Sequence, residues 1–573
     1  MSGKTDILKS SIEHTDDLDL FNKDNETALY LAERDGNADI VHLLLQHHCN
    51  PDICNIKDKI PLLIACHNDH IQVVKLLLQH YCDRYIFYDN LANALFISCI
   101  KNRIHIARLL LQHIYDDKEQ NATKAYIPLS DEIEGADYIN TLSPNNQTCL
   151  DIVASHTGNI DMLALLLEYK ADLDISSPLC SAASNGSIDI VNILLKHNAN
   201  PNICNNDKET SIYIAALHGY TEIVKLLLNY DCNFNICNEE NETPLFVASG
   251  KGNVEIVKLL LHHKCELNLC NKRHETPLFI AVAHNHFEVM ELLLHHECEL
   301  NMFNKESMTP LYIASYSGLT NIAKLLIDHR CKIEVCDSSD TSPLYAATCF
   351  GNTEIVKYIF NQQKTELDIS IETYKKVLST AVDNSNAHIV ELLMQNNCNP
   401  NICNYDDEKP LITASRNASL QGFAEIVELL LEHDCDPNIC DKYGETPLNI
   451  AAGKGYIDIV RLLLKQNCDT NKCNKQMETP LFKATFKGYA EIAETLLENN
   501  SNPDLCDKYK QSPLHIASSM GHTRIVELLL GYNCNTNLRN QRHESALDVA
   551  SHMGHTDIIT LLRRENKRKC KIS

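Results

Sequence analysis

The feature that most constrains this chain is a motif that returns every 33 residues. Residues 242–245 read Glu-Thr-Pro-Leu, and the same four residues recur at 275–278. An Ile-Val-x-Leu-Leu-Leu run keeps the same interval at residues 223–228 and 256–261. A fixed period of this length indicates a stack of similar structural units rather than one globular core. Further Thr-Pro-Leu or Ser-Pro-Leu strings end at Leu311, Leu344, Leu448, Leu481 and Leu514.

Each unit is predicted to contain two short antiparallel helices. Thr243 would cap the first helix and Pro244 would take its first position, where the missing N–H costs nothing. This helix is expected to end near Gly252, and the apolar run 254–261 to form the second. A hairpin precedes each cap, as residues 232–241 precede Thr243. Because neither helix is long enough to be stable alone in water, each unit needs a neighbour on either side.

These motifs resemble the ankyrin repeat, whose pattern is a Thr-Pro-Leu-His-x-Ala-Ala helix, a Gly-His turn, a Val-x-Leu-Leu-Leu helix and a Gly-Ala-Asp-x-Asn hairpin. Residues 512–517, Ser-Pro-Leu-His-Ile-Ala, match it most closely. The resemblance covers about nine tenths of the chain and implies an all-α ankyrin-repeat solenoid of stacked helix-turn-helix units with β-hairpin loops. Sixteen units are counted from their anchor residues, Leu29, Leu62, Leu95, Leu150, Leu179, Ile212, Leu245, Leu278, Leu311, Leu344, Leu378, Leu411, Leu448, Leu481, Leu514 and Leu547.

The repeat pattern is interrupted in several places. The longest break is polar, and the sequence leaves open whether the stack of repeats is divided there. A second interruption is in the fifth unit, whose hairpin at residues 172–177 is shortened. We therefore expect five segments: an N-terminal cap or degenerate half repeat at 1–23, repeats one to three at 24–115, a polar insertion or partial repeat at 116–146, repeats four to sixteen at 147–562, and a basic tail at 563–573.

The charge and the lack of long apolar runs exclude several classes of partner. The formal net charge is −25, from 76 acidic and 51 basic residues, so the averaged field repels the phosphates of nucleic acids. No apolar stretch approaches the roughly 20 residues that span a bilayer, and residues 1–19 are polar rather than a signal core. We expect a cytoplasmic or nuclear protein with no membrane span and no nucleic-acid partner.

The cysteines recur in Cys-x4-Cys pairs, which could suggest metal binding. Zinc fingers, however, use a closer spacing and a second ligand pair. The first Cys of each pair takes the small, buried Ala position of the ankyrin hairpin, so we interpret these residues as packing groups, and we expect no metal site and no cofactor. The pairs are Cys49/Cys54, Cys232/Cys237, Cys265/Cys270, Cys331/Cys336, Cys398/Cys403, Cys435/Cys440 and Cys468/Cys473.

Histidines follow the Leu-Leu-Leu runs by two residues, which places them in the last turn of the second helix. They are either ordinary helix-end residues, which a protonated imidazole would suit, or a pH-responsive ladder. They are His47, His80, His113, His197, His263, His296, His329 and His433.

No catalytic motif of the kind His-Glu-x-x-His, Gly-x-x-x-x-Gly-Lys or Gly-x-Ser-x-Gly occurs, so we expect no enzymatic activity. The resemblance implies a scaffold or adaptor that binds other proteins through the concave face of hairpin tips and first helices. The alternatives are a substrate-recognition subunit of a ubiquitin-ligase-type or other enzyme complex, and a nuclear regulatory ankyrin protein. The predicted protein-binding tip residues are Lys272, Arg273, Glu275, Lys305, Glu306, Lys442, Tyr443, Glu445, Lys475, Gln476, Lys508 and Tyr509.

A basic cluster follows the last repeat. It can be a nuclear-import signal or the solvated face of a cap, with cations at a helix end. Its members are Arg563, Arg564, Lys567, Arg568, Lys569 and Lys571.

Overall fold

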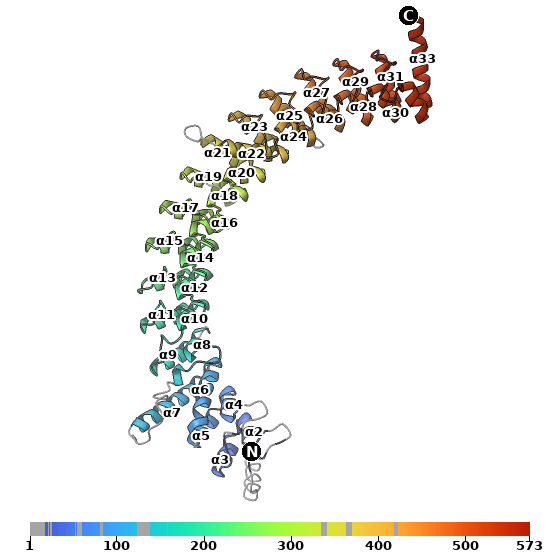
Figure 1. Ribbon diagram of the computed structural model, residues 1–573. Coiled ribbons are helices and arrows are strands. Elements are labelled where there is room, and N and C mark those ends of the chain that lie inside the picture. Colours follow the sequence, from blue (N-terminus) through green and yellow to red (C-terminus); the bar gives the residue numbers. More distant parts are fainter. Residues whose placement is uncertain are drawn as a thin grey trace. The chain divides into compact units, whose positions relative to one another are not determined.

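The computed structural model describes residues 18–20, 22, 26–51, 53, 60–80, 84–122, 138–156, 159–333, 341–362, 370–417 and 422–572. In these residues 32 α helices form sixteen consecutive pairs (Figure 1). The chain divides into a first unit, Met1–Glu299, and a second unit, Leu300–Ser573, with eight pairs in each. The expected all-α architecture of repeated helix pairs is confirmed.

The first unit alternates first and second helices along the chain, and the 3-10 turn η1 (Tyr138–Asn140) lies between α7 and α8. Its first helices are α2 (Ala28–Arg34), α4 (Pro61–His67), α6 (Arg84–Ile100), α8 (Cys149–Ala154), α10 (Pro178–Ser184), α12 (Ser211–His218), α14 (Pro244–Lys251) and α16 (Pro277–Ala283). Its second helices are α3 (Ala38–Gln46), α5 (Ile71–His80), α7 (Ile104–Ala122), α9 (Ile160–Glu168), α11 (Ile188–Lys196), α13 (Thr221–Leu228), α15 (Val254–His262) and α17 (Phe287–His295).

The second unit repeats the same alternation. Its first helices are α18 (Pro310–Tyr316), α20 (Pro343–Cys349), α22 (Ile371–Asp383), α24 (Pro410–Asn417), α26 (Pro447–Lys454), α28 (Pro480–Lys487), α30 (Pro513–Met520) and α32 (Ala546–Met553). Its second helices are α19 (Thr320–Asp328), α21 (Thr353–Gln362), α23 (Ala387–Gln395), α25 (Gly422–Glu432), α27 (Ile457–Lys465), α29 (Ala490–Glu498), α31 (Thr523–Gly531) and α33 (Thr556–Ile572).

Local sequence sets the ends of the first helices, as α14 shows. The Thr243 hydroxyl accepts a hydrogen bond from the backbone N–H of Phe246 at 3.1 Å, and Pro244 occupies the first helical position. Gly252 ends the helix with φ at +72° and donates its N–H to the carbonyl of Ala248. The predicted cap and stop residues are therefore the ones that the structure uses.

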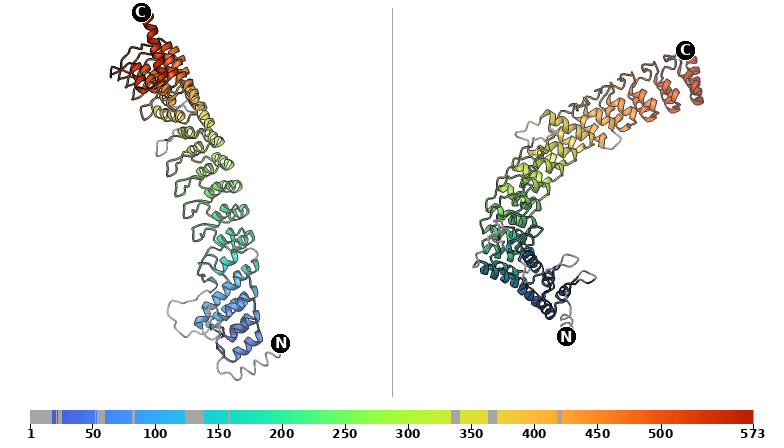
Figure 2. Two further views of the ribbon diagram at one scale, coloured as in Figure 1. Left: turned by 90° about the vertical axis from the view of Figure 1, so that its right-hand side faces the viewer. Right: turned by 60° about the horizontal axis from the view of Figure 1, so that its bottom comes forward.

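The core of each unit runs along its stack of pairs. Neighbouring first helices pack against each other, and neighbouring second helices do the same, so that each unit consists of two rows of helices beside a row of connecting loops (Figure 2). Fifteen of the sixteen anchor residues are at most 4% exposed. The exception is Leu547, in the last pair, which is half-buried. Burial of the anchors confirms the register that was read from the sequence.

Asparagine side chains connect successive loops within a unit. Asn235 Oδ1 accepts the backbone N–H of Glu266 at 3.1 Å in the first unit, and Asn471 Oδ1 accepts that of Asn502 at 2.7 Å in the second. Each bond spans 31 residues, close to one repeat. These bonds satisfy loop amides that helices cannot reach and fix the spacing between neighbouring loops.

The predicted insertion at residues 116–146 begins inside a helix, because α7 continues to Ala122. Residues 123–137 lie outside the described part of the chain, as do residues 1–17 of the predicted N-terminal cap. Helices on the two sides of the insertion are in contact, since α6 packs against α8 and η1 and α7 packs against α9. The five segment boundaries remain predictions.

Candidate functional site

The hairpin tips are shaped by an Asn or Asp side chain rather than by strands. Asn474 Oδ1 accepts the backbone N–H groups of Gln476 and Glu478, both at 2.9 Å. Because this side chain takes up the N–H groups of the turn, little strand pairing forms: among the described residues only an isolated β-bridge, between Cys204 and Thr210, is present. The tips are therefore closed turns with a defined conformation.

Backbone hydrogen bonds join each tip to the next within the second unit. Lys475 donates its N–H to the carbonyl of Tyr443 at 3.0 Å, and Lys508 donates to that of Gln476 at 3.1 Å. Tips from successive repeats consequently lie side by side in a fixed row. Side chains that are 33 residues apart in sequence can contact one partner together.

The structure separates the twelve predicted tip residues into two units. Lys272, Arg273 and Glu275 belong to the first unit, and the other nine belong to the second. Ten of the twelve side chains are exposed, while Glu275 and Glu445 are half-buried. Glu275 is turned back onto its own hairpin, where Oε2 accepts the amide of Asn271 at 2.9 Å. These two glutamates stabilise tips and present little surface to solvent; a role of the twelve in binding stays a prediction.

One tip of the second unit carries an unusual pair of carboxylates. At the Asn474 tip the residue four positions later is Glu478, and the two side chains share a hydrogen bond of 2.8 Å. The tip of the preceding repeat has Asp441 in place of the asparagine and Glu445 four positions later, and Asp441 Oδ1 accepts the backbone N–H groups of Tyr443 and Glu445. A nearby cation stabilises the charged form of each carboxylate in such a turn.

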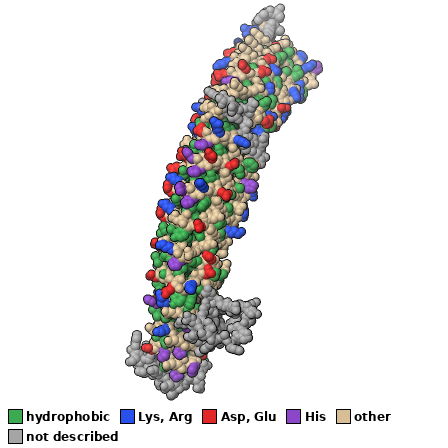
Figure 3. All heavy atoms as spheres, turned by 90° about the vertical axis from the view of Figure 1, so that its left-hand side faces the viewer, with side chains coloured by type: hydrophobic (Ala, Val, Ile, Leu, Met, Phe, Trp, Pro, Cys, Tyr) green, Lys and Arg blue, Asp and Glu red, His purple; other side chains and the backbone are tan. Residues whose placement is uncertain are grey.

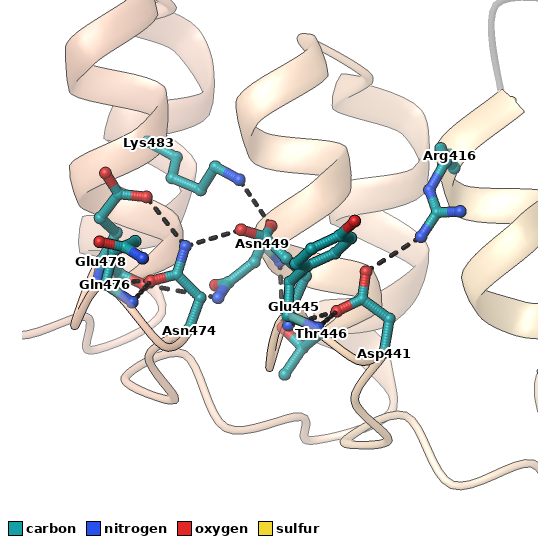
Figure 4. A network of polar contacts seen from close by, with 10 residues as sticks. Arg416, Asp441, Glu445, Thr446, Asn449, Asn474, Gln476, Glu478 and Lys483 are labelled. Carbon is teal, nitrogen blue, oxygen red and sulfur yellow. Dashed lines mark hydrogen bonds and ion pairs between the residues drawn. The ribbon is translucent and has the colours of Figure 1, made fainter. Parts of the chain in front are cut away.

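Two cations balance these carboxylates, one on each of the first helices that flank α26 (Figure 4). Arg416 on α24 lies 3.0 Å from Asp441 and 2.6 Å from Glu408. Lys483 on α28 lies 2.5 Å from Glu445. Burial acts to lower the pKa of Arg416, but its hydrogen bonds and charge contacts with Glu408 and Asp441 outweigh this and raise the pKa. Arg416 and Lys483 are therefore already engaged in ion pairs within the protein.

A hollow of about 590 Å³ lies beside this network, and we name it the tip groove. Tyr443 lines it with 60% of its surface exposed. Because Arg416 and Lys483 are engaged, Lys454 and Lys487 are the lining cations that form no ion pair within the described residues. The residues that define the tip groove are Arg416, Asp441, Tyr443, Glu445, Lys454, Lys483, Lys487 and Tyr489.

A second hollow of about 520 Å³ lies two repeats further along the same unit. Tyr509 from a tip and Met553 at the end of α32 line it, together with Arg542 and His552. His552 lies 3.1 Å from Glu544. The tips and first helices of the second unit therefore present hollows that combine exposed aromatic or Met side chains with basic groups.

Exposed aromatic side chains concentrate in the second unit. Of the ten that are exposed among the described residues, Phe287 lies in the first unit and nine lie in the second. By contrast, the face seen in Figure 3, on which the second helices of the first unit lie, carries interspersed acidic, basic and His side chains. On the second helices α13 and α15, Lys225 pairs with Glu222 at 2.6 Å and Lys258 with Glu255 at 2.7 Å.

The sequence matches the family model described as ankyrin repeats (3 copies) over residues 1–87, 150–236, 179–271, 212–304, 296–373, 344–438, 416–505 and 481–572. These matches overlap and together cover well over half of the chain. The chain belongs to the ankyrin-repeat family. Ankyrin repeats are in general modules for protein–protein interaction and are typically non-catalytic. No curated protein matches the sequence.

The tip groove of this ankyrin-repeat protein includes residues outside the twelve predicted tip residues. Lys454 and Lys487 lie at the ends of first helices, and Tyr489 immediately follows the glycine that ends α28. Lys454 and Lys487 are 33 residues apart, as are Tyr456 and Tyr489. Aligning the sixteen repeats and comparing the residues around the helix-ending glycine would have identified these positions.

Six of the seven first cysteines of the pairs are buried, as expected for packing groups, whereas Cys232 is half-buried. Cys265 and Cys331 are buried, and burial raises the pKa of each thiol to about 12. At neutral pH these thiols are protonated and therefore poor nucleophiles and metal ligands. No group of three or more His, Cys, Asp or Glu residues arranged to hold a metal occurs in the described part of the chain, from which Cys54 and Cys336 are missing.

Most of the selected histidines lie at helix ends, but the expectation for His113 was wrong. Nδ1 of His197 is 2.9 Å from the carbonyl oxygen of Ile193, and Nδ1 of His329 is 2.9 Å from that of Leu325, in the geometry of a helix-end hydrogen bond. His113 instead lies within α7, because this helix continues to Ala122. The pH-responsive ladder remains a hypothesis.

The terminal basic cluster lies on α33. Arg563, Arg564, Lys567 and Arg568 are exposed on this helix, while the side chains of Lys569 and Lys571 lie outside the described part. No helix in the described ranges has the length and apolar character needed to cross a bilayer.

Proposed function

We propose that this ankyrin-repeat protein is a non-catalytic scaffold or adaptor that binds partner proteins through the tip groove of its second unit. The observation that carries the proposal is the tip groove itself, in which Tyr443 and Tyr489 stand beside two lysines that form no ion pair with any described residue. Tyrosine is enriched at the energetic centres of protein interfaces because it contributes both apolar area and a hydroxyl. Two such ammonium groups in a chain of net charge −25 favour a partner segment that bears carboxylates.

Replacing both Tyr443 and Lys487 with serine should weaken partner binding about tenfold, or about 1.4 kcal/mol. The change removes one aromatic wall and one available cation without touching the ion pairs of Arg416 and Lys483. Affinity capture from native cells would identify the partner, and titration of that partner onto the wild-type and variant chains would measure the loss.

The control is the double variant Lys225→Ser and Lys258→Ser on second helices of the first unit, where both lysines are exposed and paired only with glutamates three residues away. Such surface pairs contribute little to stability, and this variant should retain its partner. If the tip-groove variant holds every partner as tightly as the wild type does, binding does not take place there.

For location, we propose residence in the cytoplasm or nucleus, with the α33 cluster acting as an import signal. Its four described basic side chains are exposed together on one terminal helix, where a receptor has access. Changing Arg563, Arg564, Lys567 and Arg568 to glutamate should reduce the nuclear fraction of a fluorescently tagged chain in cells.

The control, which reverses half as many charges, changes two other exposed arginines to glutamate, Arg461 and Arg524, on α27 and α31. This control changes the net charge without altering the cluster. If the nuclear fraction falls equally in both variants, or does not fall in either, the cluster is not an import signal and is only the solvated face of a cap.

A further inference from the structure

The first unit contains a hollow of about 530 Å³ at the fifth repeat, where the hairpin is shortened. Its lining comes from α8 and the residues before it, from α10 and the residues before it, and from the hairpin and α12 of the sixth repeat. The helices α8, α10 and α12 are neighbours in the stack (Figure 1). The size is within the usual range of ligand pockets. Among its lining residues are Leu142, Asp151, Ser155, Ile175, Ser181 and Asn205.

Asp151 occupies a repeat position whose side chain bonds to the hairpin that follows in several other repeats. In the sixth repeat the Tyr213 hydroxyl donates to Glu242 Oε2 at 2.8 Å. In the fifteenth, His515 Nε2 lies 3.0 Å from the Glu544 carbonyl, which can accept its hydrogen bond. Both partners lie 29 residues further along the chain.

Asp151 has no hairpin residue 29 positions further along the chain, because Cys180, which holds that position, lies inside α10. Asp151 Oδ2 accepts the N–H of Thr148 at 2.8 Å, as part of a capping box. Asp151 Oδ1 is buried and has no hydrogen-bond partner among the residues that the structure describes, and the whole residue is only 3% exposed. A buried acceptor left without a donor is unfavourable, so the site is suited to a ligand that brings one.

The surroundings of Asp151 favour a cation on an apolar stem. The lining contains a second carboxylate, Glu209, and one histidine, His218, and contains no Lys or Arg within the described residues. Leu142 and Ile175 in the lining are 48% and 49% exposed, and they offer apolar surface to a methylene chain. Because Oδ2 is already engaged, only Oδ1 lacks a partner, and a single acceptor suits the point charge of an ammonium group better than the two-pronged guanidinium.

We propose that this hollow, which we name the Asp151 pocket, binds a lysine side chain of a partner protein, with the ammonium group donating to Asp151 Oδ1. The methylene chain would lie against Leu142 and Ile175. The Asp151 pocket belongs to the first unit and the tip groove to the second, and the two prefer opposite charges. This inference shares with the proposed function only the premise that the ligand is a protein.

The test is calorimetric titration of the full chain with the peptide acetyl-Leu-Lys-Leu-amide. We expect saturable binding that weakens about tenfold or more in Asp151→Asn, because the amide places a donor or a neutral acceptor where the carboxylate was. Acetylation of the peptide's lysine should weaken binding to the wild-type chain to the same extent. The matched control is Asp548→Asn, since Asp548 forms the same capping box with Ser545 but does not line the Asp151 pocket.

Several outcomes would overturn the proposal: no binding at about 10 mM peptide, equal binding of the acetylated peptide, or an unchanged affinity in Asp151→Asn. Spermidine competing more strongly than the peptide would identify a free amine, not a protein side chain, as the ligand. If Asp151→Asn melts well below the wild type, Glu209→Gln supplies the second variant, and it too should weaken the peptide. If the tip-groove variant loses its partner but the wild-type chain does not bind the peptide, the proposed function is supported and the proposal for the Asp151 pocket is refuted.

Discussion

Replacing Leu481 with alanine is expected to lower the free energy of local unfolding around α28 by about 3 kcal/mol. Leu481 is 0% exposed and anchors α28, which packs against α26 on one side and α30 on the other. Alanine would lose the transfer free energy of the missing carbons and leave a cavity that helices held on both sides cannot readily fill. Hydrogen exchange of the amides in α26 and α28, followed by mass spectrometry, would measure this loss directly.

Leu547 provides the matched control, because it holds the same anchor position in the last pair. It is half-buried, and α30 is the neighbouring first helix that packs against its helix, α32. Leu547→Ala should therefore cost about 1 kcal/mol, since less surface is buried and less of a cavity forms. Equal losses at the two positions would show that stacking on both sides does not determine how strongly an anchor stabilises its repeat.

The repeat architecture could be predicted because its determinants are local. Thr243, Pro244 and Gly252 set the ends of α14 through contacts within a few residues, and the pattern recurs often enough to fix the register. The helix ends are harder where no stop signal exists. Because no glycine or proline lies between His113 and Ala122, α7 runs on and takes this histidine into its interior.

The site was predictable only in part, because its decisive contacts join distant residues. Tyr443 was selected correctly as an exposed tip residue, whereas Glu445 is held by Lys483, 38 residues away. Nothing in the hairpin's own sequence shows that its glutamate turns inward. The shortened hairpin at residues 172–177 was visible in the sequence, but the lack of a partner for Asp151 Oδ1 among the described residues depends on packing between three repeats.

The paired carboxylates at Asp441 and Glu445 lead to the second large prediction. Arg416→Gln should lower the free energy of local unfolding at this tip by about 2 to 3 kcal/mol, because it leaves Asp441, whose side chain is 2% exposed, as a buried charge without its ion-pair partner. We expect a smaller loss of unfolding free energy than for a fully buried ion pair, because the Arg416 side chain is 32% exposed. Hydrogen exchange of the amides of Tyr443 and Glu445, which bond to Asp441 Oδ1, would report it.

Adding Asp441→Asn to Arg416→Gln separates loss of charge balance from loss of packing. An asparagine at this position already closes the neighbouring tip at Asn474, where its Oδ1 accepts the same two kinds of backbone N–H and its amide donates to Glu478. The new asparagine in the double variant would keep the turn and could donate to Glu445, so most of the lost stability should return. If the double variant is as unstable as Arg416→Gln alone, Arg416 stabilises the tip by packing, and the cations beside the tip groove are not there to balance its carboxylates.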